Sequence, residues 1–181
     1  EGHALGRQAF NASKVLPQDH VFFCATATWF LERHRLHEAS ARRADRGRPF
    51  DVAPVGALVE VRVFNLALRL CREYEEKKMY MQLGVAVGLL KQLFMLLDEL
   101  VKHGKGDVRR VALLLRRNVF YEGEVRKLID SLIKAYEPFR MRVSYLHDVI
   151  LCAHAALNQL EAHGRSGDLV ARKRRRRKKR K

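Results

Sequence analysis

The sequence lacks the features that mark several large classes of protein. Its 181 residues include only three cysteines, and Cys24, Cys71 and Cys152 lie far apart in the chain. This usage disfavours a disulfide framework and favours a reducing compartment. The longest apolar stretch, residues 79–101, is interrupted by three charged side chains, so the sequence predicts no membrane-spanning segment.

Proline and strand patterns are scarce as well. Three of the four prolines, Pro17, Pro49 and Pro54, lie in the first third of the chain. No segment shows strongly the alternation of apolar and polar residues that strands require. Because proline interrupts helices, most of the chain is free to form long ones. The composition therefore predicts an all-α protein.

Apolar residues recur at helical spacing in six segments. These lie at about 19–35, 51–72, 79–102, 107–117, 122–137 and 144–161. Asp19 is the expected cap of the first helix. The third helix is apolar almost throughout, so we expect it to be buried on several sides. In the last helix the residues expected to face inward are Leu146, Val149, Ile150, Ala153, Leu157 and Leu160.

Six helices joined by short turns favour helical hairpins stacked into an α-solenoid of the armadillo or HEAT kind. No clear internal repeat is visible, which leaves a compact helical bundle as the alternative. The expected organisation has three parts. Residues 1–17 form a weakly ordered lead-in, and residues 18–163 form the helical domain, with a mobile basic loop at about 38–50. Residues 164–181 form a flexible joint and a basic tail.

Charge is concentrated at the end of the chain. The net charge is +16, of which the tail supplies +10, so the preceding 171 residues carry only +6. Like charges in an unbroken run repel one another and form no core, but they attract polyanions such as DNA. The tail is therefore a candidate for non-specific duplex DNA binding, for nuclear import, or for both. It comprises Arg172, Lys173, Arg174, Arg175, Arg176, Arg177, Lys178, Lys179, Arg180 and Lys181.

Two further surfaces are candidates for interaction. Six arginines between Arg33 and Arg48 predict either a second basic patch or a solvated linker. Phe120, Tyr121 and Glu122 lie at a helix junction and could dock a partner. The favoured interpretation is that the two aromatic rings pack helices together and that Glu122 caps the next helix. Trp29 is likewise expected in the core.

No constellation of residues indicates catalysis, a metal or a cofactor. Cys152 and His154 are two positions apart on a helix, so they point to different faces and are poorly placed to share a ligand. Gly84 and Gly88 have a spacing that allows helices to approach closely, and they do not form a phosphate-binding loop. The sequence therefore predicts that the chain is not an enzyme.

Several motifs together resemble the Timeless family, the large subunit of the eukaryotic replication fork protection complex. Ala-Phe-Asn at 9–11 precedes Thr-Trp-Phe-Leu-Glu at 28–32. Asn-Val-Phe-Tyr-Glu at 118–122 precedes a leucine-rich helix that ends in Lys-Ala-Tyr-Glu-Pro at 134–138. Tyr-Leu-His-Asp-Val at 145–149 begins the last apolar helix before the basic run. The resemblance spans roughly residues 9–181, and the order of the motifs carries it.

The resemblance implies a nuclear, non-enzymatic scaffold from the N-terminal helical region of such a protein. Its implied partners are a small Tipin-like subunit, the MCM-containing replicative helicase, a checkpoint mediator and duplex DNA. The implied role is to stabilise replication forks and to support S-phase checkpoint signalling and fork pausing. A helical-repeat adaptor in ribosome assembly, or in other RNA-linked nuclear work, is the alternative, because basic tails are common there too.

Overall fold

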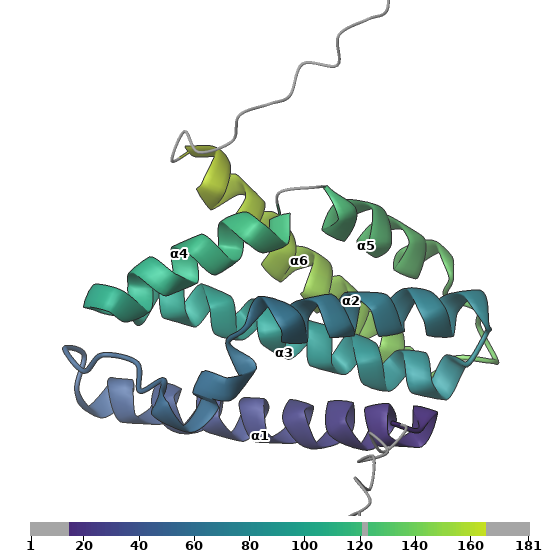
Figure 1. Cartoon of the computed structure of the whole chain (residues 1–181), viewed down its shortest axis with the longest axis horizontal. Helices are drawn as coiled ribbons and strands as arrows, with labels where there is room; N and C mark the ends of the chain where they lie inside the picture. The colour runs from purple at the N-terminus through teal and green to yellow at the C-terminus, as the bar shows by residue number, and fades with distance from the viewer. Residues whose placement is uncertain (1–14, 121–122, 166–181) are drawn as a thin grey trace, which may run out of the picture.

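The computed structural model describes residues 15–120 and 123–165, and every regular element in these ranges is helical. This confirms the predicted all-α class. Six α-helices and one short 3-10 helix pack against one another (Figure 1). The elements are α1 (Pro17–Ala44), η1 (Ala53–Leu58), α2 (Val61–Glu76), α3 (Tyr80–His103), α4 (Gly106–Phe120), α5 (Glu124–Lys134) and α6 (Val143–Arg165).

Helix α3 is the centre of the core, as its apolar composition predicts. It packs against α1, α2, α4 and α6, and half of its residues are buried. Phe94 on α3 connects two neighbouring helices through ring contacts. Its centroid lies 5.8 Å from that of Phe64 on α2 and 5.5 Å from that of Phe120 on α4. Aromatic pairs at these separations stabilise a core beyond the area they bury.

The three long helices α1, α3 and α6 run in the same direction, with α3 between the other two. On the α1 side, Arg35 donates a hydrogen bond to Gln92, and further along both helices Arg42 pairs with Glu99. On the α6 side, Lys91 pairs with Asp148, and later along both helices Gln159 donates to Asp98. Because sequence position rises together on both partners, each pair of helices is parallel.

Equivalent helices begin at a constant interval along the chain, which we call the 63-residue stride. Helices α1, α3 and α6 begin at Pro17, Tyr80 and Val143, so each start lies 63 residues after the previous one. Helices α2 and α5 begin at Val61 and Glu124, which are again 63 residues apart. Side chains also join these two shorter helices, since Arg72 of α2 pairs with the carboxylate of Glu124.

The predicted helix starts need two corrections. Helix α1 is capped at Leu16, and Asp19 lies in the first turn, where its carboxylate accepts the Leu16 backbone N–H at 2.8 Å. That arrangement is the acidic half of a capping box. The second predicted helix is two elements, because Glu60 between η1 and α2 has an extended backbone. Pro54 lies in the first turn of η1, where its missing N–H is not needed.

The basic loop expected at about 38–50 is much shorter than predicted. Helix α1 continues to Ala44, and the connection to η1 is held against α1. Glu38 is 1% exposed, and its carboxylate accepts the Asp51 backbone N–H and pairs with Arg48. Phe50 is buried beside His34, with ring centroids 5.3 Å apart. A buried carboxylate and a buried ring therefore fix a segment whose composition indicates a mobile linker.

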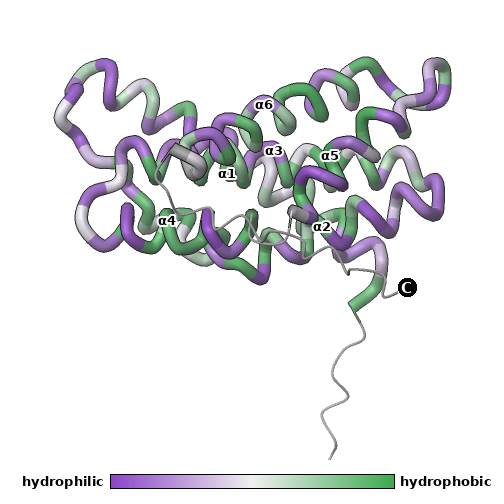
Figure 2. The backbone as a smooth tube through the Cα atoms, turned by 90° about the horizontal axis from the view of Figure 1, so that it is seen from above, coloured by the Kyte–Doolittle hydropathy of each residue, from purple (hydrophilic) through white to green (hydrophobic). Residues whose placement is uncertain are grey.

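The predicted inward face of the last helix is rotated. Val149 is buried, but Ile150 and Leu157 are more than half exposed, and Cys152 and Ala156 lie in the core in their place. Helix α6 also extends to Arg165, so the joint expected from residue 164 begins inside its last turn. Figure 2 shows hydrophobic and hydrophilic residues alternating along the helices, as expected of helices that bury one face.

Candidate interaction surfaces

A groove of about 590 Å³ lies where α1, α3 and the start of α6 meet. Thr28 of α1 forms one wall, with the exposed Trp29 at its outer rim, and Tyr145 of α6 lies on the other. Gly84 and Gly88 of α3 also line it. The three parallel helices therefore present one continuous hollow surface, as expected of a site for a peptide or a protein segment.

The two glycines of α3 have different environments. A side-chain carbon at Gly88 would lie 3.6 Å from the Thr28 methyl group, so α1 approaches α3 closely there. A carbon at Gly84 would meet no atom within 4 Å. The predicted close packing of helices is thus confirmed at Gly88, whereas Gly84 leaves open space in the groove.

Charged side chains of both signs surround the groove. Arg140 pairs with Glu137, which also accepts a hydrogen bond from the Tyr80 hydroxyl at 3.0 Å. Glu32 on the α1 wall and Arg142 on the α6 side are exposed and form no ion pair with any described residue. They lie on different walls of the groove, and each is free to pair with an opposite charge on a ligand.

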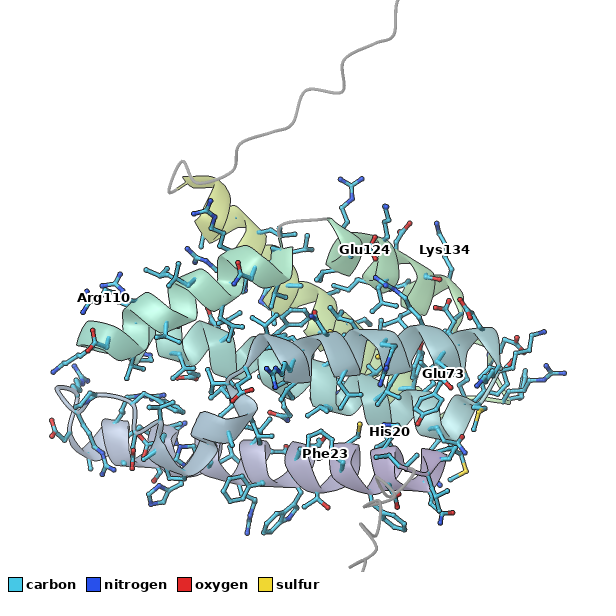
Figure 3. The ribbon with its side chains drawn as sticks, in the orientation of Figure 1. His20, Phe23, Glu73, Arg110, Glu124 and Lys134 are labelled. Carbon is cyan, nitrogen blue, oxygen red and sulfur yellow. The ribbon has the colours of Figure 1, made fainter. Side chains whose placement is uncertain are left out.

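The side of α1 that faces away from α3 is strongly apolar. Phe22 is 70% exposed, Trp29 is 62% exposed and Leu36 is 58% exposed. The prediction that Trp29 lies in the core is therefore wrong. Large side chains project from this side in Figure 3. We name this surface the outer face of α1, and it comprises Phe22, Phe23, Trp29, Phe30 and Leu36.

Two adjacent pairs of aromatic residues in the sequence indicate that α1 is apolar on more than one side. Phe22 and Phe23 are adjacent, and so are Trp29 and Phe30 seven residues later. Adjacent helical positions lie about 100° apart, so one narrow inward stripe cannot contain both members of each pair. A helix that is apolar all round is usually buried all round. The outer face of α1 is therefore suited to contact with another chain or segment.

A basic end lies where α1 and α3 finish and α4 begins. Lys105 donates a hydrogen bond to the Gly47 carbonyl at 3.0 Å, which joins the turn after α3 to the turn after α1. The cations of this end are exposed, and Arg43, Arg46 and Arg109 have no carboxylate partner among the described residues. Unpaired exposed cations of this kind suit phosphate groups.

Of the predicted docking and DNA-binding residues, the structure describes only Phe120. Phe120 is 4% exposed and packs on Phe94, which agrees with the packing interpretation of that aromatic. Tyr121 and Glu122 lie outside the described residues, and so does the whole basic tail, 172–181. The structure thus brings arginines of the expected second basic patch to the same end as the turn after α3, a juxtaposition that the sequence did not predict.

The three cysteines are buried in the core. Cys24, Cys71 and Cys152 are free thiols at 1% exposure or less. Burial raises the pKa of Cys24 to about 11 and that of Cys152 to about 12, so both thiols stay protonated near neutrality. His154 is exposed and hydrogen-bonds Asn158, so it points away from Cys152, as predicted. Across residues 15–120 and 123–165, no cluster of His, Cys, Asp or Glu could hold a metal ion.

Comparison with known proteins assigns no family. No protein-family model matches the chain, and no curated protein matches it. Within the described ranges, no helix has the length and apolarity needed to cross a membrane.

Proposed function

We propose that the chain is a non-enzymatic scaffold of the Timeless type, acting at nuclear replication forks through contacts with proteins and DNA. The observation that carries the proposal is the row of parallel helices α1, α3 and α6 with its 63-residue stride. Together with the motif order seen in the sequence, this stride supports an armadillo-like solenoid. In such a fold, η1, α2 and α3 form one unit and α4, α5 and α6 form the next.

The surfaces have the chemistry that such a role needs. The groove and the outer face of α1 offer apolar contact area, and aromatic residues such as Trp29 are typical anchors of protein interfaces. The basic end and the basic tail offer phosphate contacts without base readout. The proposed partners are a Tipin-like subunit, the MCM-containing helicase, a checkpoint mediator and duplex DNA.

Affinity purification tests the protein contacts. The bait is the chain without residues 172–181, used beside the full chain in nuclease-treated nuclear extract from S-phase cells. Both baits should recover a Tipin-like subunit or helicase subunits, because nuclease and tail removal eliminate bridging by nucleic acid. Recovery of ribosome-assembly factors in their place would favour the RNA-linked adaptor. Recovery of neither group would contradict the scaffold proposal.

Salt-dependent DNA binding tests the electrostatic part. For duplex DNA, removing one cation that neutralises a phosphate should reduce the slope of log affinity against log salt concentration by about 0.9. Deleting residues 172–181 should therefore flatten the slope while the helical content stays unchanged. Replacing Arg43, Arg46 and Arg109 by glutamine should flatten it further, by up to about 2.7 if each binds one phosphate. The matched control replaces Arg126, Lys127 and Lys134 of α5, which removes the same charge elsewhere.

A further inference from the structure

The outer face of α6 mirrors the outer face of α1. It comprises Val143, Ile150 and Leu157, which are 75%, 55% and 61% exposed and lie seven residues apart. Phe22, Trp29 and Leu36 on α1 have the same spacing and similar exposure. A seven-residue repeat of apolar side chains keeps one continuous seam turned towards a partner helix.

The two outer faces lie at opposite ends of the row of parallel helices. Helix α1 turns Thr28, Arg35 and Arg42 towards α3, and at 100° per residue the outer face lies on its other side. Helix α6 turns Asp148 and Gln159 towards α3. Its outer face likewise points away. Among the described helices, only α3 has long parallel helices on both sides.

The apolar area at the α1 end is large for a surface in water. Four aromatic side chains of α1 are between 38% and 70% exposed. At about 150–250 Å² for each aromatic side chain, they leave on the order of 400 Å² uncovered. The largest apolar patch on a typical monomer has about this area and is often a binding site.

We propose that a second copy of this chain covers these faces, with the outer face of α6 in one copy packed in parallel on the outer face of α1 in the next. The contact continues the packing that α1 makes on α3 and that α3 makes on α6. It joins two different surfaces, so it is heterologous and can extend beyond a dimer. This pairing depends on the helix packing and the two apolar faces, whether or not the chain acts at replication forks.

Two observations favour this pairing over contact between two α1 helices. A symmetric pairing of α1 with α1 leaves both α6 outer faces in water, whereas the parallel pairing covers one face of each kind. Between Val143 and Leu157, α6 carries the polar residues Ser144, Tyr145, His147, Asp148 and His154, but no lysine or arginine. Arg33, which lies between the aromatic pairs of α1 and Leu36, therefore meets no lysine or arginine from α6.

A complementation experiment tests the pairing, and the only tryptophan of the chain, Trp29, reports on it. One variant, F22Q/W29Q/L36Q, removes the α1 face and all tryptophan emission. The other, V143Q/I150Q/L157Q, removes the α6 face and keeps Trp29. Sedimentation and fluorescence are measured at about 100 μM protein, because interfaces of modest area often bind in the micromolar range. About 0.3 M salt screens the repulsion between cationic copies.

The proposed pairing predicts a different oligomeric state for each sample. The unmodified chain forms species larger than a dimer, each variant alone stays monomeric, and their mixture forms one-to-one dimers. In the mixture the Trp29 emission shifts to shorter wavelength, since the α6 face of the other variant covers it. A control, V111Q/L114Q, changes two exposed residues of α4 and should associate like the unmodified chain.

Three results would overturn the proposal. The V143Q/I150Q/L157Q variant could dimerise alone, which would indicate pairing of α1 with α1. The mixture could remain monomeric, or the unmodified chain could remain monomeric at about 100 μM, where micromolar interfaces are occupied. Circular dichroism confirms that each variant is folded, and W29Q alone, tested beside them, should already weaken association.

Discussion

Phe50 is expected to hold the connection between α1 and η1 in place. Its ring is 4% exposed, meets His34 edge-on, and lies 5.6 Å from the guanidinium carbon of Arg42. Its backbone N–H donates to the His103 carbonyl at 3.2 Å, which ties the connection to the end of α3. Phe50→Ala removes the ring contacts and leaves the backbone bond possible.

The expected loss of stability follows from the buried area. Burying an aromatic side chain covers about 150–250 Å², which corresponds to roughly 4–6 kcal/mol at about 25 cal/mol per Å². Measured Phe→Ala changes in cores cost about 3–5 kcal/mol. Because the connection is short and can partly collapse, we expect about 3 kcal/mol, at the lower end of that range.

Urea unfolding followed by circular dichroism measures this loss. The midpoint should fall with little change in slope, because the surface exposed on unfolding is nearly the same. Phe139→Ala is the matched control, since Phe139 is fully exposed, and it should change stability by less than about 0.5 kcal/mol. A loss below about 1 kcal/mol for Phe50→Ala, well under the range for core rings, would refute the reasoning and restore the mobile loop.

Three further predictions concern the core and the junctions. Gly104→Ala should destabilise the turn before α4, because the new carbon would clash with the Leu100 carbonyl oxygen, whereas Gly56→Ala should be tolerated in urea unfolding. Tyr145→Phe should cost about 1 kcal/mol in the same assay, because it removes a buried hydroxyl bond to a carbonyl of α5. Unfolded thiols ionise near pH 8.5, but burial raises the pKa of Cys24 to about 11 and of Cys152 to about 12. Their contribution to stability is therefore complete below about pH 8.5 and is lost as pH rises through about 11 for Cys24 and about 12 for Cys152. Alanine at both positions should flatten that loss.

Periodicity predicted the helices, and the apolar composition of the third helix predicted its burial on several sides. Within the segment predicted at 51–72, Phe64, Leu68 and Cys71 recur at helical spacing, and all three are buried on the inner face of α2. Periodicity failed where a helix is apolar on more than one side, because it does not say which side meets the core. Ile150 was placed inward for that reason and is in fact 55% exposed. Trp29 was placed in the core because large aromatic residues usually lie there.

The 63-residue stride could not be read from residue identities. Trp29, Gln92 and Ala155 are each the thirteenth residue of their helices, yet they share no chemistry. Gln92 and Ala155 are 2% and 9% exposed, whereas Trp29 lies at the end of the row. Long-range contacts were equally hidden, since only the fold brings the turn at Gly47 to Lys105 and so forms the basic end.

Recovery of the chain on newly replicated DNA tests the central proposal most directly. Cells expressing the tagged chain receive a short pulse of a labelled nucleoside, with or without a chase, and the labelled DNA is isolated with its crosslinked proteins. A fork scaffold should be enriched after the pulse together with helicase subunits and depleted after the chase. Equal recovery before and after the chase would indicate general chromatin binding, and no recovery would place the chain away from forks; either result would contradict the account.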